Sequence, residues 1–310
     1  MTGESTINYG VSLYSYTGDM YTVLALDDAM AEIASVGATG IEILGEGNMH
    51  GYPEPPASWI DQWWASLEAH GLTPTNYCSW VDIGVARGRD LTADEGDAVL
   101  RGEIALASSL GFSTIRPKFG VVSMEHDPHP AWTTIVETNL DFAAERDIVI
   151  CPEIHAPTPI KHKVVDDYIA FIERTGSPHF RLMIDTGIFQ REVATAVQPG
   201  MSADAHKGGW MSPLAVPMSD LIDVLPYVGF IQAKFFDIDE NLVDAQVPWR
   251  EIIETLISYG YSGWLSSEYE GERIAYRGQE QVRSHHALMR SIERDVRSVA
   301  GGSRATPASE

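Results

Sequence analysis

Four polar residues stand at or near the ends of four separate apolar runs in this 310-residue chain. They are Glu153 in IVICPEIH, Asp185 in FRLMIDTG, Gln232 in VGFIQAKF and Glu268 in GWLSSEYEG. Three carboxylates brought together repel one another, and a bound divalent cation relieves that repulsion. Carboxylate and carboxamide oxygens are hard ligands that favour manganese or magnesium over zinc. The pattern predicts one metal site held by these four side chains.

Two further residues with useful chemistry lie two positions from a predicted ligand. His155 follows Glu153, and Lys234 follows Gln232, so each pair shares one face of a strand. We interpret His155 as a candidate catalytic base. The alternative is a polar residue at a strand end whose hydrogen bonds are satisfied and which has no catalytic role. Lys234 either stabilises an oxyanion or pairs with a carboxylate, and the sequence does not choose between these roles.

Other charged and aromatic residues are candidates for holding a substrate. Arg116 and Lys118 end the run STIRPKFG on one strand face, where two cations would orient substrate oxygens. Glu268 and Glu270 also share a face. Glu268 follows its apolar run more closely, so it is the predicted metal ligand and also a candidate catalytic residue. Glu270 is predicted to lie nearer the rim of the site and to contact the substrate. Aromatic residues near strand ends offer stacking surfaces, and these are Tyr14, Trp80, Trp210 and Tyr269.

The elements that must position these residues alternate between strand-like and helix-like along the whole chain. Eight apolar strand-like runs are each followed by a segment with helical spacing of its apolar residues. The predicted strands are 7–13, 40–44, 72–80, 113–118, 147–155, 179–187, 227–236 and 261–269. Glycines that suit left-handed helix ends follow several of the helices, at Gly37, Gly71, Gly111, Gly176 and Gly260. Eight strand–helix pairs in about 290 residues match the size of a (β/α)₈ barrel, whose strand ends converge on one catalytic face.

We therefore predict a single (β/α)₈ TIM barrel over residues 1–300 and a disordered tail over 301–310. An open doubly wound sheet is the weaker alternative, because no glycine-rich phosphate loop follows the first strand. The connection 187–214 is long enough for a lid or for a structural insertion.

Composition narrows the classes of function and the compartment. With 44 acidic and 21 basic residues the formal net charge is −23, which makes nucleic acid an improbable partner. No run reaches the roughly 20 apolar residues of a membrane span, and MTGESTINYG lacks the features of an export signal. Cys78 and Cys151 read as buried thiols of a reducing compartment. A cytoplasmic protein is the expectation.

With these residues in place, the chain over roughly 7–295 resembles the sugar isomerase/epimerase superfamily of xylose-isomerase-like barrels. The resemblance rests on Glu153 with His155, on Asp185, and on GYSGWLSSEYEG, which contains Glu268. It implies a divalent metal, usually manganese, magnesium or cobalt, held by Glu, Asp, His and Glu. The chain departs from the family pattern in two places. Gln232 stands where His is typical, and Ile188 stands where the His of a D-x-x-H motif would be.

The segments PEIHAPTPIK and DTGIFQ resemble, more narrowly, the large subunits of bacterial C-glycoside deglycosidases. That resemblance implies a carbon–carbon lyase acting on 3-oxo-C-glycosides, a small β subunit as partner and a hetero-oligomer. One base suffices for such a lyase, and His155 is the candidate.

Three other functions remain under consideration. A ketose isomerase or 3-epimerase would use two bases, Glu153 and Glu268. A non-catalytic barrel that binds a partner would explain the departures from the family pattern. A nuclease of the related endonuclease IV type would need a His-rich zinc site and a basic surface, and the sequence shows neither.

Overall fold

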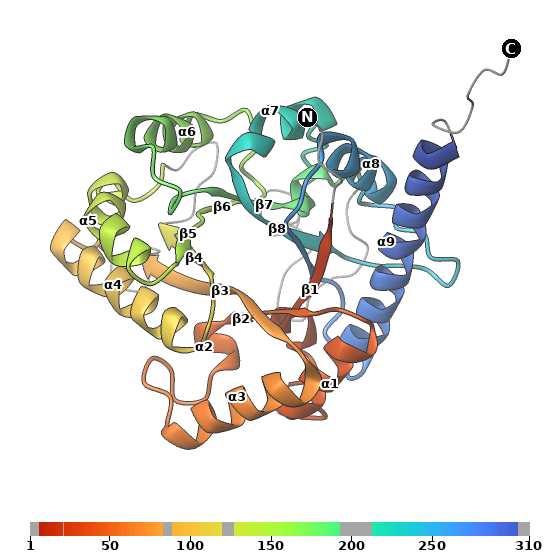
Figure 1. Cartoon of the computed structure of the whole chain (residues 1–310), viewed down its shortest axis with the longest axis horizontal. Helices are drawn as coiled ribbons and strands as arrows, with labels where there is room; N and C mark the ends of the chain where they lie inside the picture. The colour runs from red at the N-terminus through yellow and green to blue at the C-terminus, as the bar shows by residue number, and fades with distance from the viewer. Residues whose placement is uncertain (1–5, 21, 83–88, 120–126, 193–212, 303–310) are drawn as a thin grey trace, which may run out of the picture.

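The computed structural model describes residues 6–20, 22–82, 89–119, 127–192 and 213–302. Within them, parallel strands form a central ring and helices pack around its outside (Figure 1). The predicted single (β/α)₈ barrel is confirmed. Helix α9 runs to Gly302, while 193–212, with Trp210, and 303–310 lie outside the described residues.

The strands agree closely with the predicted runs, except that the fifth consists of two pieces. They are β1 Asn8–Ser12, β2 Gly40–Leu44, β3 Thr73–Asp82, β4 Thr114–Phe119, β5 Val149–Ile150, β6 Glu153–Ile154, β7 Leu182–Asp185, β8 Val228–Phe235 and β9 Trp264–Tyr269. All neighbouring pairs are parallel, and β1 lies between β2 and β9.

The ring closes at the interrupted fifth strand. Strand β5 pairs with β4, and β6 pairs with β7. Between them Pro152 has no N–H to give to a ladder, which accounts for the break. The segment still contacts both neighbours, because Cys151 N donates to Ile115 O and Met183 N donates to Pro152 O. The two strand pieces therefore act as one barrel strand that ends at Glu153 and Ile154.

The helices follow the strands as the apolar spacing predicts. They are α1 Leu26–Ser35, α2 Gly45–Asn48, α3 Ala57–His70, α4 Ala93–Ser109, α5 Trp132–Ala144, α6 Lys163–Thr175, α7 Met218–Val224, α8 Trp249–Tyr259 and α9 Arg277–Gly302. Among the described residues, short 3-10 turns extend three connections, at Leu13–Tyr16, Thr186–Phe189 and Leu225–Tyr227. Every glycine predicted at a helix end has a positive φ, between 62° and 85°. In the described chain, no helix combines the length and apolar character needed to cross a membrane.

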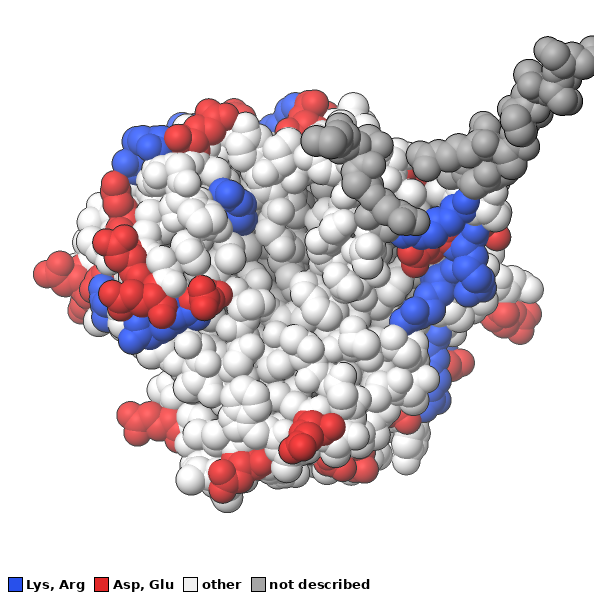
Figure 2. Space-filling model, in the orientation of Figure 1, with Lys and Arg blue, Asp and Glu red and all other residues white. Residues whose placement is uncertain are grey.

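Burial follows the two layers of the barrel. The strand interiors are fully buried, as in β7, where all four residues are buried. The outer helices bury one stripe each, for example Val164, Val165 and Tyr168 of α6. On the face shown in Figure 2 the charged side chains gather around the edge, over the outer helices, and the centre is uncharged.

Two consecutive histidines on α9 are buried against the ring. His285 bonds through Nδ1 to Ser267 Oγ at 2.9 Å and stacks on Phe235, with ring centroids 4.0 Å apart. His286 packs edge-on against Tyr9. Burial lowers the pKa of both rings, that of His286 to about 3. Both histidines are therefore neutral in the folded protein at neutral pH.

We predict that this pair makes the fold sensitive to acid. An unfolded histidine titrates near pH 6.5, so between that pH and the lowered folded pKa the unfolded state binds more protons. Stability is then present above pH 6.5 and is lost as pH falls, by up to about 1.4 kcal/mol per pH unit for each histidine. Urea denaturation at pH 7.5 and 5.5 measures the loss. His286→Phe should reduce it, whereas the same exchange at the exposed His50 should not. Equal losses in all three proteins would contradict the prediction.

Candidate active site at the carboxyl ends of the strands

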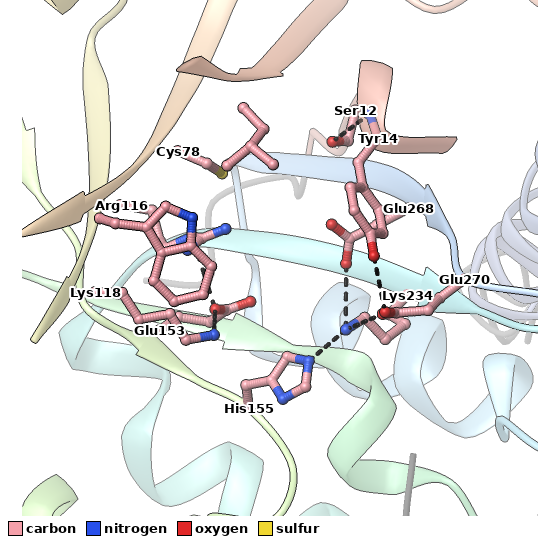
Figure 3. A pocket seen from close by; sticks show the side chains of 12 residues that line it. Ser12, Tyr14, Cys78, Arg116, Lys118, Glu153, His155, Lys234, Glu268 and Glu270 are labelled. Carbon is pink, nitrogen blue, oxygen red and sulfur yellow. Dashed lines mark hydrogen bonds and ion pairs between the residues drawn. The ribbon is translucent and has the colours of Figure 1, made fainter. Parts of the chain in front are cut away.

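A hollow with about 490 Å³ of empty space, open to solvent, lies at the carboxyl ends of the strands (Figure 3). Seven of the barrel strands or the turns that follow them contribute to its wall. The lining residues are Ser12, Tyr14, Leu44, Cys78, Trp80, Arg116, Lys118, Glu153, His155, Lys234, Glu268 and Glu270. Most of the residues singled out in the sequence are among them.

The ammonium group of Lys234, on β8, lies at the centre of the cluster (Figure 3). Its Nζ is 2.9 Å from Asp185 Oδ2, 3.4 Å from Glu268 Oε2 and 2.5 Å from Glu270 Oε2. It also donates to His155 Nε2. Burial alone would lower the pKa of Lys234, but the carboxylates, Asp185 foremost, hold it well above its usual value. Of the two roles left open by the sequence, the structure shows pairing with carboxylates.

His155, directly after β6, presents one lone pair to this cluster. Its Nδ1 contacts the carbonyl oxygen of Ala156, which can only accept, so Nδ1 carries the hydrogen. Nε2 is therefore the acceptor for Lys234, and it lies 3.5 Å from Asp185 Oδ2. Burial and the nearby Lys234 ammonium lower the pKa of the ring. A neutral imidazole with Nε2 exposed to the cluster suits either a base or a metal ligand.

The opposite wall of the hollow is cationic. Lys118 Nζ lies 2.8 Å from Glu153 Oε2, and Arg116 Nε lies 3.7 Å from the same oxygen. Both cations lie over the Trp80 ring, 5.4 Å and 5.7 Å from its centroid. Burial would raise the pKa of Glu153, but Lys118 and Arg116 hold it well below its usual value. Glu153 is therefore an ionised carboxylate and a weak base.

Sequence reasoning missed Glu42 on β2, a fully buried residue that contacts the predicted ligands. Gln232 Nε2 donates to Glu42 Oε1 and to Glu268 Oε1, both at 2.6 Å. Burial raises the pKa of Glu42 to about 7 and that of Glu268 well above its usual value. The signal was available: in GIEIL a carboxylate interrupts a fully apolar strand, where charged residues are rare unless paired.

The two remaining predicted aromatic contacts have different outcomes. Tyr14 lines the hollow and donates from its hydroxyl to Glu270 Oε1 at 3.2 Å. Tyr269 is not among the lining residues. It is buried and packs against Phe235, because successive side chains of a strand alternate and Glu268 and Glu270 take the inner face.

The residues present suit a hard divalent cation. Donor atoms of Glu153, His155 and Asp185 lie within 4.8 Å of one another. Gln232 Oε1 is buried with no hydrogen-bond partner among the described residues, which leaves a carboxamide oxygen to be satisfied.

The charge balance of the cluster also favours a bound divalent cation. Its carboxylates outnumber its cations by five to three, an excess of two negative charges when all are ionised, as a dication would neutralise. The carboxylates are Glu42, Glu153, Asp185, Glu268 and Glu270, and the cations are Arg116, Lys118 and Lys234.

Comparison with known proteins agrees with this fold. The model of a family described as the xylose isomerase-like TIM barrel matches residues 30–292. The 3'-dehydrocarminate deglycosidase alpha subunit of a Microbacterium species is 24% identical, over 97% of this chain and 99% of that protein. A C-glycoside deglycosidase alpha subunit of Arthrobacter globiformis is also 24% identical, over 94% of each chain. The solved structure of an L-ribulose 3-epimerase superposes with a TM-score of 0.69 at 16% identity, over 97% of this chain and 100% of that one.

We predict that Glu42 destabilises the folded protein as pH rises. Its folded pKa of about 7 exceeds its ordinary value of 4.5, so the protonated group stabilises below pH 4.5 and that contribution is lost as pH rises through 7. Glu42→Gln keeps an acceptor oxygen but cannot ionise. We compare the free energy of unfolding of this variant with that of the wild type in chelator-treated protein. The advantage of the variant should be larger at pH 8 than at pH 5, by up to about 3 kcal/mol. The exposed Glu145, changed to Gln, is the control. A gain that does not depend on pH would refute this account of Glu42.

Proposed function

Because the chain belongs to the xylose isomerase-like TIM barrel family, we propose that it is a metal-dependent carbon–carbon lyase that cleaves 3-oxo-C-glycosides. The names of its relatives support a sugar-modifying enzyme of the deglycosidase type. The observation that carries the proposal is the asymmetry of the site. One neutral histidine faces a ring of carboxylates, and an ionised glutamate is held by two cations on the other side.

We assign the metal to Glu153, Asp185, Glu268 and the carboxamide oxygen of Gln232, with manganese the expected ion and magnesium or cobalt as alternatives. A divalent cation held there supplies Lewis acidity to a ketone oxygen. Gln232 suits this role because its Nε2 is committed to Glu42 and Glu268, which leaves Oε1 as the ligand atom.

The chain's own residues then carry the protons of an elimination. His155 Nε2 takes the proton from the carbon next to the ketone, and the electron pair moves toward the ketone oxygen. When the ketone re-forms, the bond to the aglycone carbon breaks and a double bond forms in the sugar. The departing carbon needs a proton, which His155, protonated in the first step, returns to it. Arg116, Lys118 and Trp80 line the hollow where they would contact the bound glycoside, and Glu270 lines the opposite wall.

An epimerase is the second candidate, favoured by the structural likeness to an L-ribulose 3-epimerase. Epimerisation needs bases on both faces of the sugar, Glu153 and Glu268 in this chain. Glu153 is a weak base because Lys118 and Arg116 keep its pKa well below the usual range. That asymmetry supports the one-base elimination.

A partner subunit is part of the proposal, because the relatives are named alpha subunits. An open hollow admits water, which would reprotonate the enolate formed in the first step, so a covering subunit has a chemical purpose. Self-association of this chain is the alternative cover. The alternative outside the enzymes is a non-catalytic barrel, which would bind a partner without turnover.

We predict that turnover of a 3-oxo-C-glucoside needs both metal and partner. The manganese-loaded chain is assayed alone and with a candidate small subunit added, with release of the aglycone as the readout. Chelation should abolish the activity of the pair. Full activity of the isolated chain would rule out the partner requirement. If ketohexoses are epimerised and no aglycone is released, the protein is an epimerase and not a lyase. Binding of the partner without any turnover would favour the non-catalytic barrel.

We predict that His155→Ala lowers the rate on the order of 10²-fold or more while manganese binding persists. The reason is that Nε2 is assigned to the base and the oxygen ligands remain. Isothermal titration with manganese and an aglycone-release assay separate the two effects, and His50→Ala is the control at an exposed histidine. If metal affinity falls together with the rate, His155 is a ligand. If turnover is unchanged, the base is elsewhere.

A further inference from the structure

Lys234 is bound to the same atoms that a metal or a catalytic base would use. Its Nζ contacts Asp185 Oδ2 at 2.9 Å and also His155 Nε2. These residues are two of the three whose donor atoms lie within 4.8 Å of one another as a metal-binding group. Lys234 is almost fully buried, with an exposure of 2%, so the position of its ammonium is fixed by these contacts rather than by solvent.

The contacts of Lys234 exclude other uses of His155. Because Nδ1 carries the hydrogen, Nε2 has a single lone pair, and the ammonium of Lys234 takes it. A metal needs that lone pair if His155 is a ligand, and a substrate proton needs it if His155 is the base. Either role requires the ammonium to leave. A dication and an ammonium also repel each other strongly at the distances of this cluster.

The structure also contains a place for the ammonium to go. Glu270 Oε2 lies 2.5 Å from Lys234 Nζ, and Glu270 is not one of the assigned metal ligands. Glu270 follows the end of β9, two residues beyond Glu268, and Tyr14 holds its other oxygen at 3.2 Å. The flexible four-carbon stem of lysine lets Nζ leave His155 and Asp185 and keep its contact with this carboxylate without a change in the strand.

We propose that Lys234 and a divalent cation occupy the carboxylate cluster in turn, and that metal binding moves the ammonium away from His155 and Asp185 while Glu270, which it already contacts, keeps it. Without metal, Lys234 neutralises part of the cluster and blocks His155. With metal, Nε2 is released. Metal loading is thereby coupled to the availability of the histidine. This inference rests on the metal assignment of the proposed function but not on the reaction or the substrate.

Isothermal titration with manganese tests the exchange through affinity alone. Lys234→Met removes the competing cation and should bind manganese at least about 10-fold more tightly than the wild type, within the usual range of coupling between sites. Lys118→Met is the matched control. It removes an equal charge beside Glu153 but frees neither His155 nor Asp185, so its gain should be several-fold smaller.

A double-mutant cycle separates exchange from simple charge effects. Glu270→Gln should weaken manganese binding about 10-fold in the wild type. The metal-free protein still has Asp185 and His155 to hold the ammonium, whereas the loaded protein loses the acceptor that remains to it. In the Lys234→Met background the same change should alter affinity less than about 2-fold, because Glu270 then has no ammonium to receive. Equal effects of Glu270→Gln in both backgrounds, or a gain from Lys234→Met no larger than that from Lys118→Met, would overturn the proposal.

A crystal structure of the manganese-loaded wild type gives an answer that needs no variant to fold. Lys234 Nζ should lie on Glu270 and beyond hydrogen-bond distance of His155 Nε2. Persistence of the Lys234–His155 contact in the loaded protein would refute the exchange. Aglycone release is measured separately. If the exchange is observed without turnover, the exchange proposal stands and the proposed lyase function is wrong. If turnover is observed without the exchange, the lyase function stands and the exchange proposal is wrong.

Discussion

The rest of the site depends on one buried ion cluster, in which the ammonium of Lys234 holds Asp185, Glu268 and Glu270 together. Burying several carboxylates side by side is unfavourable unless cations and hydrogen bonds compensate. Lys234 compensates only part of the cost of burying these carboxylates. The uncompensated part gives the carboxylates different proton affinities. Glu270, beside the ammonium, has its pKa held to about 2, whereas burial and its acidic neighbours raise the pKa of Glu268 well above the usual range. Carboxylates of one cluster thus differ in their affinity for a proton, and such a difference suits acid–base chemistry.

The barrel sets which side chains join that cluster. Parallel strands bring their carboxyl ends to one face, and the two-residue alternation within each strand turns Glu268 and Glu270 inward and Tyr269 outward against Phe235. The fifth strand is interrupted at Pro152, and its second piece places Glu153 between β4 and β7. Glu153 thereby meets Lys118 and Arg116 from β4 rather than Lys234, so the hollow has a cationic wall facing an acidic one.

This polarity is the reason we propose an elimination with one base rather than an epimerisation with two. A neutral His155 faces the acidic cluster, and Glu153 on the other side is too weak a base to match it. The same arrangement makes Lys234 more than a structural ion, because it occupies the lone pair that His155 would use. Relatives at 24% identity carry deglycosidase names, and the proposed chemistry rests in addition on the side chains of this chain.

The sequence by itself determined the fold and most of the members of the site. Apolar runs, helical spacing and glycines at helix ends are local signals, and they predicted eight strand–helix pairs and the strand ends on which Glu153, Asp185 and Glu268 lie. Only the tertiary structure decided how those side chains pair. Glu42 lies in β2, 190 residues before Gln232, and no local pattern links the two until the ring brings β2 and β8 to the same interior. The central place of Lys234 follows likewise from register across strands, which depends on how the barrel closes. The outward direction of Tyr269, in contrast, follows from the same alternation that puts Glu268 and Glu270 on one face.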